Sequence, residues 1–344
     1  MNAPKLRFKE FNDEYINLKY KDVLKIKSGK DQKKVECESG IYPILGTGGQ
    51  IGKTNSFLYD KPSVLIGRKG TINKPQYMET PFWTVDTLFY SHIYEPNIPK
   101  YLFYSFQNVN WKKYDESTGV PSLSSSTIES VECNIPSKEE QLKVADFLSL
   151  LDKKIELQSK KIEDLKLFKL CINNILFNGN KTVKLKDICE CKSSTISLSD
   201  IEYDDGIYPI YGANGEIKKI NSYQNDKDYL AIIKDGAGVG KTIICNKKSS
   251  IIATLSALIP NGIPVYYFNE LINKIDFSKY IVGSGIPHIY FKDYSNEKLY
   301  LHEEKKRILI NNLFKKIIIK IELEENKIHL LETLKKGLMQ NMFV

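Results

Sequence analysis

The sequence predicts an α+β fold: two mixed α/β domains in a tandem pseudo-repeat, separated by two long helices that form an antiparallel coiled coil. Three observations predict it. Short motifs recur at a nearly constant shift, the first part of each copy alternates short apolar runs with turn signals, and the second part carries an apolar heptad pattern. With 344 residues, the chain is long enough for two or three domains with sizeable cores.

Four pairs of segments reveal the repeat, at a shift of 165 or 166 residues. The pairs are Asp22-Val23 with Asp187-Ile188, Gly40-Ile41-Tyr42-Pro43-Ile44 with Gly206-Ile207-Tyr208-Pro209-Ile210, Gly119-Val120-Pro121 with Gly285-Ile286-Pro287, and Phe177 with Phe343. Anchors in one register over most of a half are hard to obtain by chance, so we interpret the chain as two copies of one unit. Two copies are too few for a solenoid.

The first part of each copy, residues 1–136 and 179–301, is rich in glycine, tyrosine, serine and β-branched residues. Short apolar runs lie at 63–66, 229–233 and 250–253, next to turn signals such as Gly48-Gly49 and Asp235-Gly236. We therefore expect a mixed α/β domain with a substantial sheet in each copy. The repeated Tyr42 and Tyr208 are expected in its core.

The second part of each copy, residues 137–178 and 302–344, is predicted to be one long helix. From Glu139 to Phe177 there is no proline or glycine. Seam residues alternate at spacings of four and three, as in a coiled coil. They are Val144, Leu148, Leu151, Ile155, Gln158, Ile162, Leu165, Lys169, Ile172 and Leu176, and in the second copy Ile310, Phe314, Ile317, Ile321, Glu324, Ile328, Leu331, Lys335, Leu338 and Met342. The alternative is two ordinary amphipathic helices, each packed on its own domain.

Two polar residues interrupt each seam at matching positions. Gln158 is matched by Glu324, and Lys169 by Lys335. A polar residue on a seam costs stability and tends to fix register or orientation. If the seams pair antiparallel, the two domains are held apart by a helix of about 60 Å. Such a molecule suits DNA with two short recognised sequences and an unread gap. Because loop 45–50 differs from loop 211–216, the target need not be a palindrome.

Composition adds weak constraints. The net charge of +8 is a mild hint of a polyanionic partner, and almost all of the positive charge is lysine, with arginine only at Arg7, Arg68 and Arg307. No apolar run is long enough for a bilayer, and residues 1–9 lack the apolar core of a secretory signal. The six cysteines form no CxxC pair, so we expect free thiols in a reducing cytosol.

Several segments of the first copy, most of them at the junction between domain and helix, form a recognisable set. They are residues 4–11, Gly119-Val120-Pro121-Ser122-Leu123-Ser124, Ile135-Pro136, Glu139-Glu140-Gln141, Ala145-Asp146-Phe147-Leu148 and Leu151-Asp152. With these segments the chain resembles the specificity subunits of type I restriction–modification enzymes. The resemblance covers essentially the whole chain. The second copy departs from it at 302–307, where the proline and glutamine of 136–141 are missing.

The resemblance implies two target recognition domains and two conserved helices, in a chain that binds double-stranded DNA and has no catalytic activity of its own. It also implies two methyltransferase subunits and two restriction (motor-nuclease) subunits as partners. S-adenosylmethionine, ATP and Mg²⁺ are expected on those partners, with no cofactor in this chain. The setting is expected to be the bacterial cytoplasm, with no membrane attachment. Alternatives are the specificity subunit of a related, type IIB-like system with fused catalytic subunits, or a solitary sequence-specific DNA-binding protein.

A nucleotide-driven enzyme is the rival from another class, because Asp235-Gly236-Ala237-Gly238-Val239-Gly240-Lys241-Thr242 looks like a P-loop. A P-loop needs glycine where Asp235 stands, and the first copy has no such loop. No Asn-Pro-Pro or Asp-Pro-Pro run of an amino-methyltransferase is present, and the four histidines have no metal-ligand spacing. The loop therefore favours a glycine-rich hairpin with a basic tip.

Candidate DNA contacts lie on the turns of the two domains. Arginine at a loop tip can read guanine, asparagine can read adenine, and lysine more often neutralises phosphate. The candidates are Thr47, Gly48, Gly49, Arg68, Lys69, Ser117 and Thr118 in the first copy, and Gly212, Asn214, Lys234, Lys241 and Ser284 in the second. The alternatives are solvated surface charges and ordinary turns. For Ser117, Thr118 and Ser284, which precede the Gly-Val/Ile-Pro motifs, the alternative is local capping.

Partner-binding candidates are apolar helix residues off the seam, Phe147 and Phe168. The alternative is that both phenylalanines pack on the adjoining recognition domain.

Overall fold

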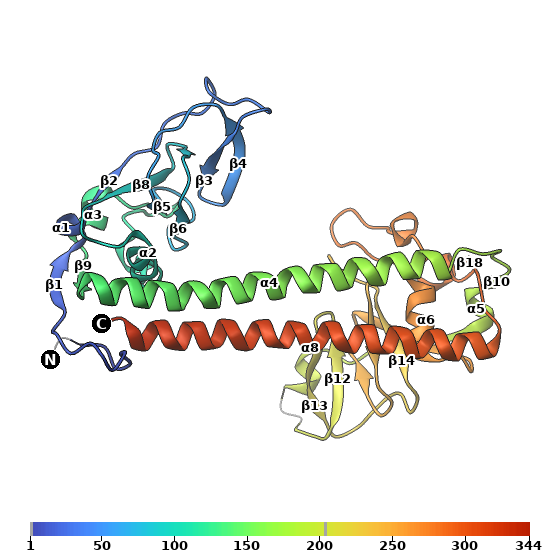
Figure 1. Cartoon of the computed structure of the whole chain (residues 1–344). Coiled ribbons are helices and arrows are strands. Elements are labelled where there is room, and N and C mark those ends of the chain that lie inside the picture. The colour runs from blue at the N-terminus through green and yellow to red at the C-terminus, as the bar shows by residue number, and fades with distance from the viewer. Residues whose placement is uncertain (1–2, 203–204) are drawn as a thin grey trace. The chain divides into compact units, whose positions relative to one another are not determined.

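The computed structural model describes residues 3–202 and 205–344 (Figure 1). The chain divides into two compact units, residues 1–158 with 327–344, and residues 159–326. Each unit combines one α/β domain with part of each long helix. The domain boundaries drawn from the sequence stay predictions, because each compact unit contains an α/β domain together with parts of both helices.

The domain of the first unit contains two main sheets. The larger has the antiparallel strand order β2-β8-β5-β6 and the smaller the order β4-β3-β7, in which β3 pairs parallel to β7. A separate antiparallel pair, β1 with β9, closes the domain beside the helices. The elements are β1 (Ile16–Lys19), α1 (Tyr20–Val23), β2 (Leu24–Lys27), β3 (Tyr42–Gly46), β4 (Gly49–Thr54), β5 (Ser63–Gly67), β6 (Gln76–Met78), β7 (Trp83–Thr84), β8 (Leu88–Ile93), α2 (Pro99–Asn108), η1 (Trp111–Tyr114), α3 (Ser125–Ser130) and β9 (Glu132–Ile135).

The domain of the second unit repeats this topology. Its sheets have the orders β11-β17-β14-β15 and β13-β12-β16, and β10 pairs with β18. The elements are β10 (Val183–Lys184), α5 (Leu185–Ile188), β11 (Cys189–Ser193), η2 (Ser199–Ile201), β12 (Tyr208–Gly212), β13 (Gly215–Ile220), β14 (Tyr229–Ile233), β15 (Thr242–Cys245), β16 (Ser250–Ile251), β17 (Leu255–Pro260), α6 (Val265–Ile272), η3 (Phe277–Tyr280), α7 (Phe291–Tyr294) and β18 (Lys298–Leu299).

The matching elements confirm the tandem repeat. The shift is 166 residues from the start of β5 at Ser63 to the start of β14 at Tyr229, and 167 from the start of β8 at Leu88 to the start of β17 at Leu255. Even the register irregularity of the small sheet recurs, at Ile44/Leu45 and Ile210/Tyr211.

The two long helices are α4 (Lys138–Leu176) and α8 (Glu304–Met342), each of 39 residues. All the predicted seam positions are buried or half-buried, and most other positions on the helices are exposed. In the second unit Lys161 of α4 pairs with Glu324 at 2.9 Å, while the Phe177 ring just beyond α4 lies 6.4 Å from that of Phe314. Residue numbers rise along one helix as they fall along the other, so the pairing is antiparallel, as predicted (Figure 1).

The core of each domain continues into the helix seam. In the first unit, Trp111, Tyr101 and Tyr104 belong to one buried cluster with Val144, Leu148 and Met339 of the helices. The repeated phenylalanines connect the layers: the Phe343 ring lies 5.2 Å from Tyr101, and the Phe177 ring 5.1 Å from Tyr267, which is the repeat counterpart of Tyr101. Within the described residues, no helix is long and apolar enough to span a membrane.

Candidate nucleic-acid interface

In the first domain the basic turn and the Gly-Val-Pro loop form one surface. The turn after β5 begins with Arg68 and Lys69, and Gly70 follows with a φ of +96°, a conformation that glycine adopts without strain. The Leu123 N–H donates to the Arg68 carbonyl at 2.9 Å, and the Gly70 N–H donates to the Pro121 carbonyl at 2.8 Å. Two motifs that the sequence separates by about 50 residues are therefore adjacent in the fold.

The second domain has the same pair of loops. The Ile289 N–H donates to the Lys234 carbonyl at 3.0 Å, and the Gly236 N–H donates to the Pro287 carbonyl at 2.8 Å. We call this arrangement, a turn bonded to the Gly-Val/Ile-Pro loop, the loop clamp. Because it recurs bond for bond, the backbone of the site is common to both copies and the side chains on it differ.

Two tight hairpins also belong to the site. Thr47-Gly48 joins β3 to β4, and Ala213-Asn214 joins β12 to β13. The residue that follows each pair is glycine at positive φ, +113° at Gly49 and +107° at Gly215. The Thr47 hydroxyl lies 3.8 Å from where a Cβ on Gly70 would stand, so the first hairpin tip is beside the first loop clamp.

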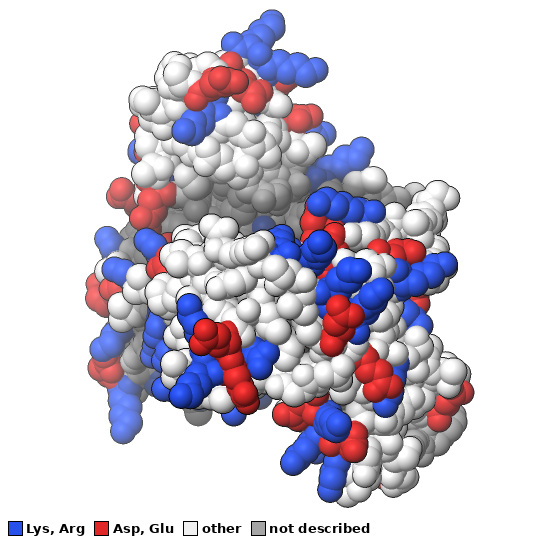
Figure 2. Space-filling view, turned by 90° about the vertical axis from the view of Figure 1, so that its right-hand side faces the viewer, with Lys and Arg blue, Asp and Glu red and all other residues white. Residues whose placement is uncertain are grey.

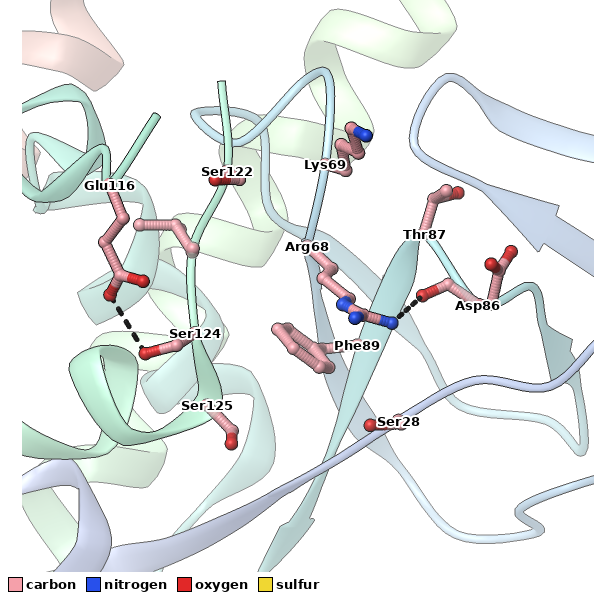
Figure 3. A pocket seen from close by; sticks show the side chains of 11 residues that line it. Ser28, Arg68, Lys69, Asp86, Thr87, Phe89, Glu116, Ser122, Ser124 and Ser125 are labelled. Carbon is pink, nitrogen blue, oxygen red and sulfur yellow. Dashed lines mark hydrogen bonds between the residues drawn. The ribbon is translucent and has the colours of Figure 1, made fainter. Parts of the chain in front are cut away.

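A hollow of about 640 Å³ opens beside the first loop clamp (Figure 3). Two cations and two carboxylates line it together with hydroxyl side chains and the Phe89 ring. The lining residues are Ser28, Arg68, Lys69, Asp86, Thr87, Phe89, Glu116, Ser122, Leu123, Ser124 and Ser125. Arg68 is exposed and bonds the Asp86 carbonyl at 3.5 Å.

The Glu116 carboxylate is held by two hydroxyl groups. Thr127 donates a hydrogen bond to it, and so does Ser124, at 2.9 Å. These bonds, that of Thr127 first, keep the pKa of the Glu116 carboxyl below its usual value, because they stabilise the charged form. Glu116 is thus an oriented anion on the wall opposite Arg68 in Figure 3.

The predicted contact residues differ in their exposure to solvent. Gly48, Lys69, Thr118, Asn214, Lys241 and Ser284 are exposed, whereas Thr47, Gly49 and Lys234 are half-buried. Ser117 donates to Asp115 at 2.8 Å, which is the local capping given as its alternative. Gly212 is buried, and a Cβ there would meet the Ile217 side chain at 2.6 Å. The backbone of Gly212 therefore does not offer the close approach to DNA that we expected of it.

The repeated tyrosines also differ from expectation. Tyr42 and Tyr208 are half-buried instead of lying in the core. Each packs against another ring near the surface, with centroids 5.4 Å apart for Tyr42 and Phe57 and 4.9 Å apart for Tyr208 and Tyr223.

Of the two candidate partner residues, only Phe168 is open to solvent, at 52% exposure. The Phe147 ring meets the Phe8 ring edge-on, with centroids 5.8 Å apart, and packs against the domain core, as its alternative stated.

The P-loop-like segment joins two strands. Residues 234–241 connect β14 to β15, and Thr242 opens the second strand. A phosphate-binding P-loop leads into a helix, whose N-terminus faces the phosphates. The segment is therefore a glycine-rich hairpin loop, and its geometry argues against the nucleotide-binding enzyme.

On the side of the molecule seen in Figure 2, charge alone does not mark a binding face. In the view of Figure 2, lysine and arginine side chains alternate with aspartate and glutamate. No group of three or more His, Cys, Asp and Glu suited to a metal ion occurs in residues 3–202 and 205–344.

Sequence reasoning missed Glu116, Asp86 and Ser124 as members of the site. Glu116 stands three residues before Gly119, outside the repeated Gly-Val/Ile-Pro motif, and its counterpart in the second copy is Val282. The position of Glu116 beside the basic turn depends on the hydrogen bonds of the loop clamp, and no local sequence pattern predicts those bonds.

Comparisons with known proteins bear on the whole chain. The family model described as the type I restriction modification DNA specificity domain matches residues 12–167 and again 178–340, once per copy. The crystal structure of the type I restriction-modification system S subunit from M. genitalium superposes with a TM-score of 0.76 at 18% identity, covering 99% of each chain. A structure from work on complex assembly and conformational transition of the type I R-M system gives 0.51 at 13% identity, covering 94% of this chain and 96% of that one. No curated protein matches the chain in sequence.

Proposed function

Because the chain belongs to the family of type I restriction modification DNA specificity domains, we propose that it recognises a two-part DNA sequence, one half-site per domain. The observation that carries this proposal is the loop clamp, present in both domains with different side chains. Arg68 is replaced by Lys234, and Glu116 by Val282. One frame with two sets of side chains fits two readers of different base sequences in double-stranded DNA.

The exposed and half-buried polar residues at the clamps and hairpins, with the glycines of the first hairpin tip, are the proposed DNA contacts. In the first domain these are Arg68, Lys69, Thr118 and the Thr47-Gly48-Gly49 tip, with Ser117 acting through the loop that it caps. In the second they are Asn214, Lys234, Lys241 and Ser284. Asparagine can bond the N6 and N7 atoms of adenine, and lysine neutralises phosphate.

Exposed apolar residues of the long helices are the proposed docking points for methyltransferase subunits. Phe168 is 52% exposed, and its repeat counterpart Leu334 is 50% exposed. Leu157 and its counterpart Leu323 are 59% and 53% exposed. Single exposed apolar residues are common, but two pairs related by the repeat favour two copies of one partner.

We extend the proposal to the remaining parts of the complex, for which family membership is the support. Two restriction subunits complete it, S-adenosylmethionine is held by the methyltransferase subunits, and ATP and Mg²⁺ serve the restriction subunits. This chain is proposed to have no catalytic residues. Purified alone, it should show no methyltransferase, nuclease or ATPase turnover, and turnover by a clean preparation would contradict that statement.

The decisive experiment maps methylated bases in a genome that carries this gene and its methyltransferase partner, with and without this chain. The expected result is one methylated motif made of two short specified sequences and an unspecified gap, present only with the chain. Methylation that is independent of the chain, or a motif that is one continuous sequence without a gap, would overturn the proposal.

A further inference from the structure

We propose that the hollow beside the first loop clamp reads one G·C base pair, with Arg68 donating to guanine and Glu116 accepting from the cytosine amino group. The inference rests on the proposed function, and it adds which base pair the first domain specifies and through which residues. In the major groove, arginine bonds the O6 and N7 atoms of guanine, and a carboxylate accepts from N4 of cytosine.

The charge of the hollow selects a base edge over a phosphate. Among the residues that line the hollow, the charges of Arg68 and Lys69 are balanced by those of Asp86 and Glu116. A phosphate in this hollow would meet two carboxylates, which repel it. The edge of a base pair offers both donors and acceptors, so a wall of mixed charge complements it.

Arg68 is placed for such a contact. Its backbone is fixed on both sides: its N–H donates to the Thr87 carbonyl at 2.8 Å, and its carbonyl accepts from Leu123. In the described part of the chain its guanidinium makes one hydrogen bond, the long one to the Asp86 carbonyl. A guanidinium has five N–H donors, so a fork of two remains for guanine.

The Glu116 carboxylate is oriented by hydrogen bonds and still has acceptor capacity left. Ser124 and Thr127 both donate to Oε1, and the Glu116 N–H donates to the Ser122 carbonyl at 3.0 Å. An ionised carboxylate accepts about four hydrogen bonds, so Oε2 keeps acceptor capacity for an amino group. The hydroxyl bonds set the direction of the carboxylate before DNA arrives, which lowers the entropy cost of binding.

The second domain lacks this reader at the matching positions. Val282 stands where the first copy has Glu116 and is 44% exposed, and Tyr290 stands in place of Ser124 and is 50% exposed. The Val282 side chain can contact a thymine methyl but cannot accept from cytosine, and Tyr290 offers a hydroxyl instead of a carboxylate. The G·C requirement therefore belongs to the first half-site.

The test uses this chain assembled with its methyltransferase partner and a duplex DNA library with both half-sites randomised. The wild-type complex should select a bipartite sequence with a G·C pair at one position of the first half-site. Arg68→Ala and Glu116→Gln should each relax preference at that same position, by about 10- to 100-fold. An unchanged second half-site in each variant shows that the protein is folded. Val282→Ala, at the matching position of the second copy, should alter no position of the first half-site.

Three outcomes would overturn the inference while leaving the proposed function intact. One is a bipartite target whose first half-site specifies no G·C pair. Another is an Arg68→Ala complex weakened equally on all sequences, with a salt slope shallower by about one, which marks a phosphate contact. The third is a Glu116→Gln complex that binds all sequences more tightly, as removal of an anion beside phosphate would cause. A wild-type complex that selects no bipartite sequence would instead overturn the proposed function itself.

Discussion

Arginine is rare in this chain, and each of the three has different surroundings. Arg7 makes a two-point ion pair with Glu140 of α4, at 2.8 and 2.7 Å. Arg68 is exposed at the first loop clamp. The Nε of Arg307 is buried without a hydrogen-bond partner among the described residues. Rarity alone therefore does not separate the three arginines, whereas the fold does, because Arg68 is the exposed one.

Arg7→Ala should destabilise the first unit by about 3 kcal/mol, because it leaves a buried carboxylate without its cation. Glu140 is 1% exposed. Of the two side chains in the described residues that donate to its carboxylate, Arg7 would be lost and the Tyr15 hydroxyl, at 2.9 Å, would remain. Chemical denaturation monitored by hydrogen exchange should show the loss of stability at the start of α4. The double variant Arg7→Met/Glu140→Leu should recover most of it. Equal loss in the single and double variants would show that the ion pair is not the cause.

His302 should make the stability of the second unit depend on pH. Burial, and then the charge of Lys306, lower the pKa of this imidazole below its ordinary value. Below about pH 6.5 the unfolded chain therefore binds a proton that the folded chain resists, so stability falls as the pH falls through that value. Thermal unfolding at several pH values should show the loss, and His302→Gln should flatten it. The exposed His329→Gln is the matched control, and an equally flattened slope there would refute the assignment to His302.

Prediction from a turn signal and a polar or charged side chain placed four of the candidate contact residues on loops, and their contact with DNA stays a prediction. Arg68, Lys69, Asn214 and Lys241 all lie on loops beside the clamps or hairpins. It misplaced Gly212, which is the last residue of β12 and is buried, with the Ile217 side chain 2.6 Å from where a Cβ would stand. It could not find Glu116, because the approach of that loop to Arg68 depends on bonds between distant segments.

At the scale of the elements, the seam lysines reach beyond the helix pair. Lys169 of α4 pairs with Glu270 of α6 at 2.6 Å, and Asn173 adds a hydrogen bond to the same carboxylate at 3.0 Å. Lys335 of α8 pairs with Asp152 of α4 at 2.6 Å and lies 5.2 Å from the Tyr104 ring centroid of α2. Each lysine thus joins its helix to the recognition domain of its own unit, which adds a second role to the register role predicted from the seam.

The two lysines should differ in energetic weight although they occupy matching positions. Glu270 is 1% exposed as a side chain, whereas Asp152 is 35% exposed. Lys169→Met should therefore cost about 3 kcal/mol, and Lys335→Met about 1 kcal/mol or less. Denaturant midpoints of the two variants measure the difference directly, and Glu270→Gln should rescue Lys169→Met. Equal costs for both lysines would show that burial of the carboxylate does not decide the effect.

Helix prediction was accurate because a heptad pattern over 39 residues is a long, redundant signal, and burial follows it at every seam position. The sheets were predicted only in outline. Their strands are two to six residues long, and the division into two sheets per domain depends on pairings such as Ile44 with Trp83 and Leu65 with Tyr90, which are distant in sequence. No local pattern contains those pairings.

At the scale of the whole molecule, the repeat predicts that the readers are interchangeable. Each recognition domain begins and ends on a matching strand pair, β1 with β9 and β10 with β18, directly before a long helix. The loop clamps, the hairpins and the ring contacts of Phe343 and Phe177 also correspond between the copies. A domain moved into the other place should therefore find the same neighbours.

Replacing residues 16–135 with residues 182–301 should give a protein with two copies of the second reader. Under the proposal that each half-site is read by its own domain, the target of this chimera should consist of two half-sites of the same sequence, equal to the second half-site of the wild-type motif. The reciprocal chimera, with 16–135 in both places, should repeat the first half-site. Methylation mapping of cells that carry each chimera with the methyltransferase partner measures both motifs. If either chimera methylates the original asymmetric sequence, or a motif containing neither half-site, then base preference is not a property of the separate domains.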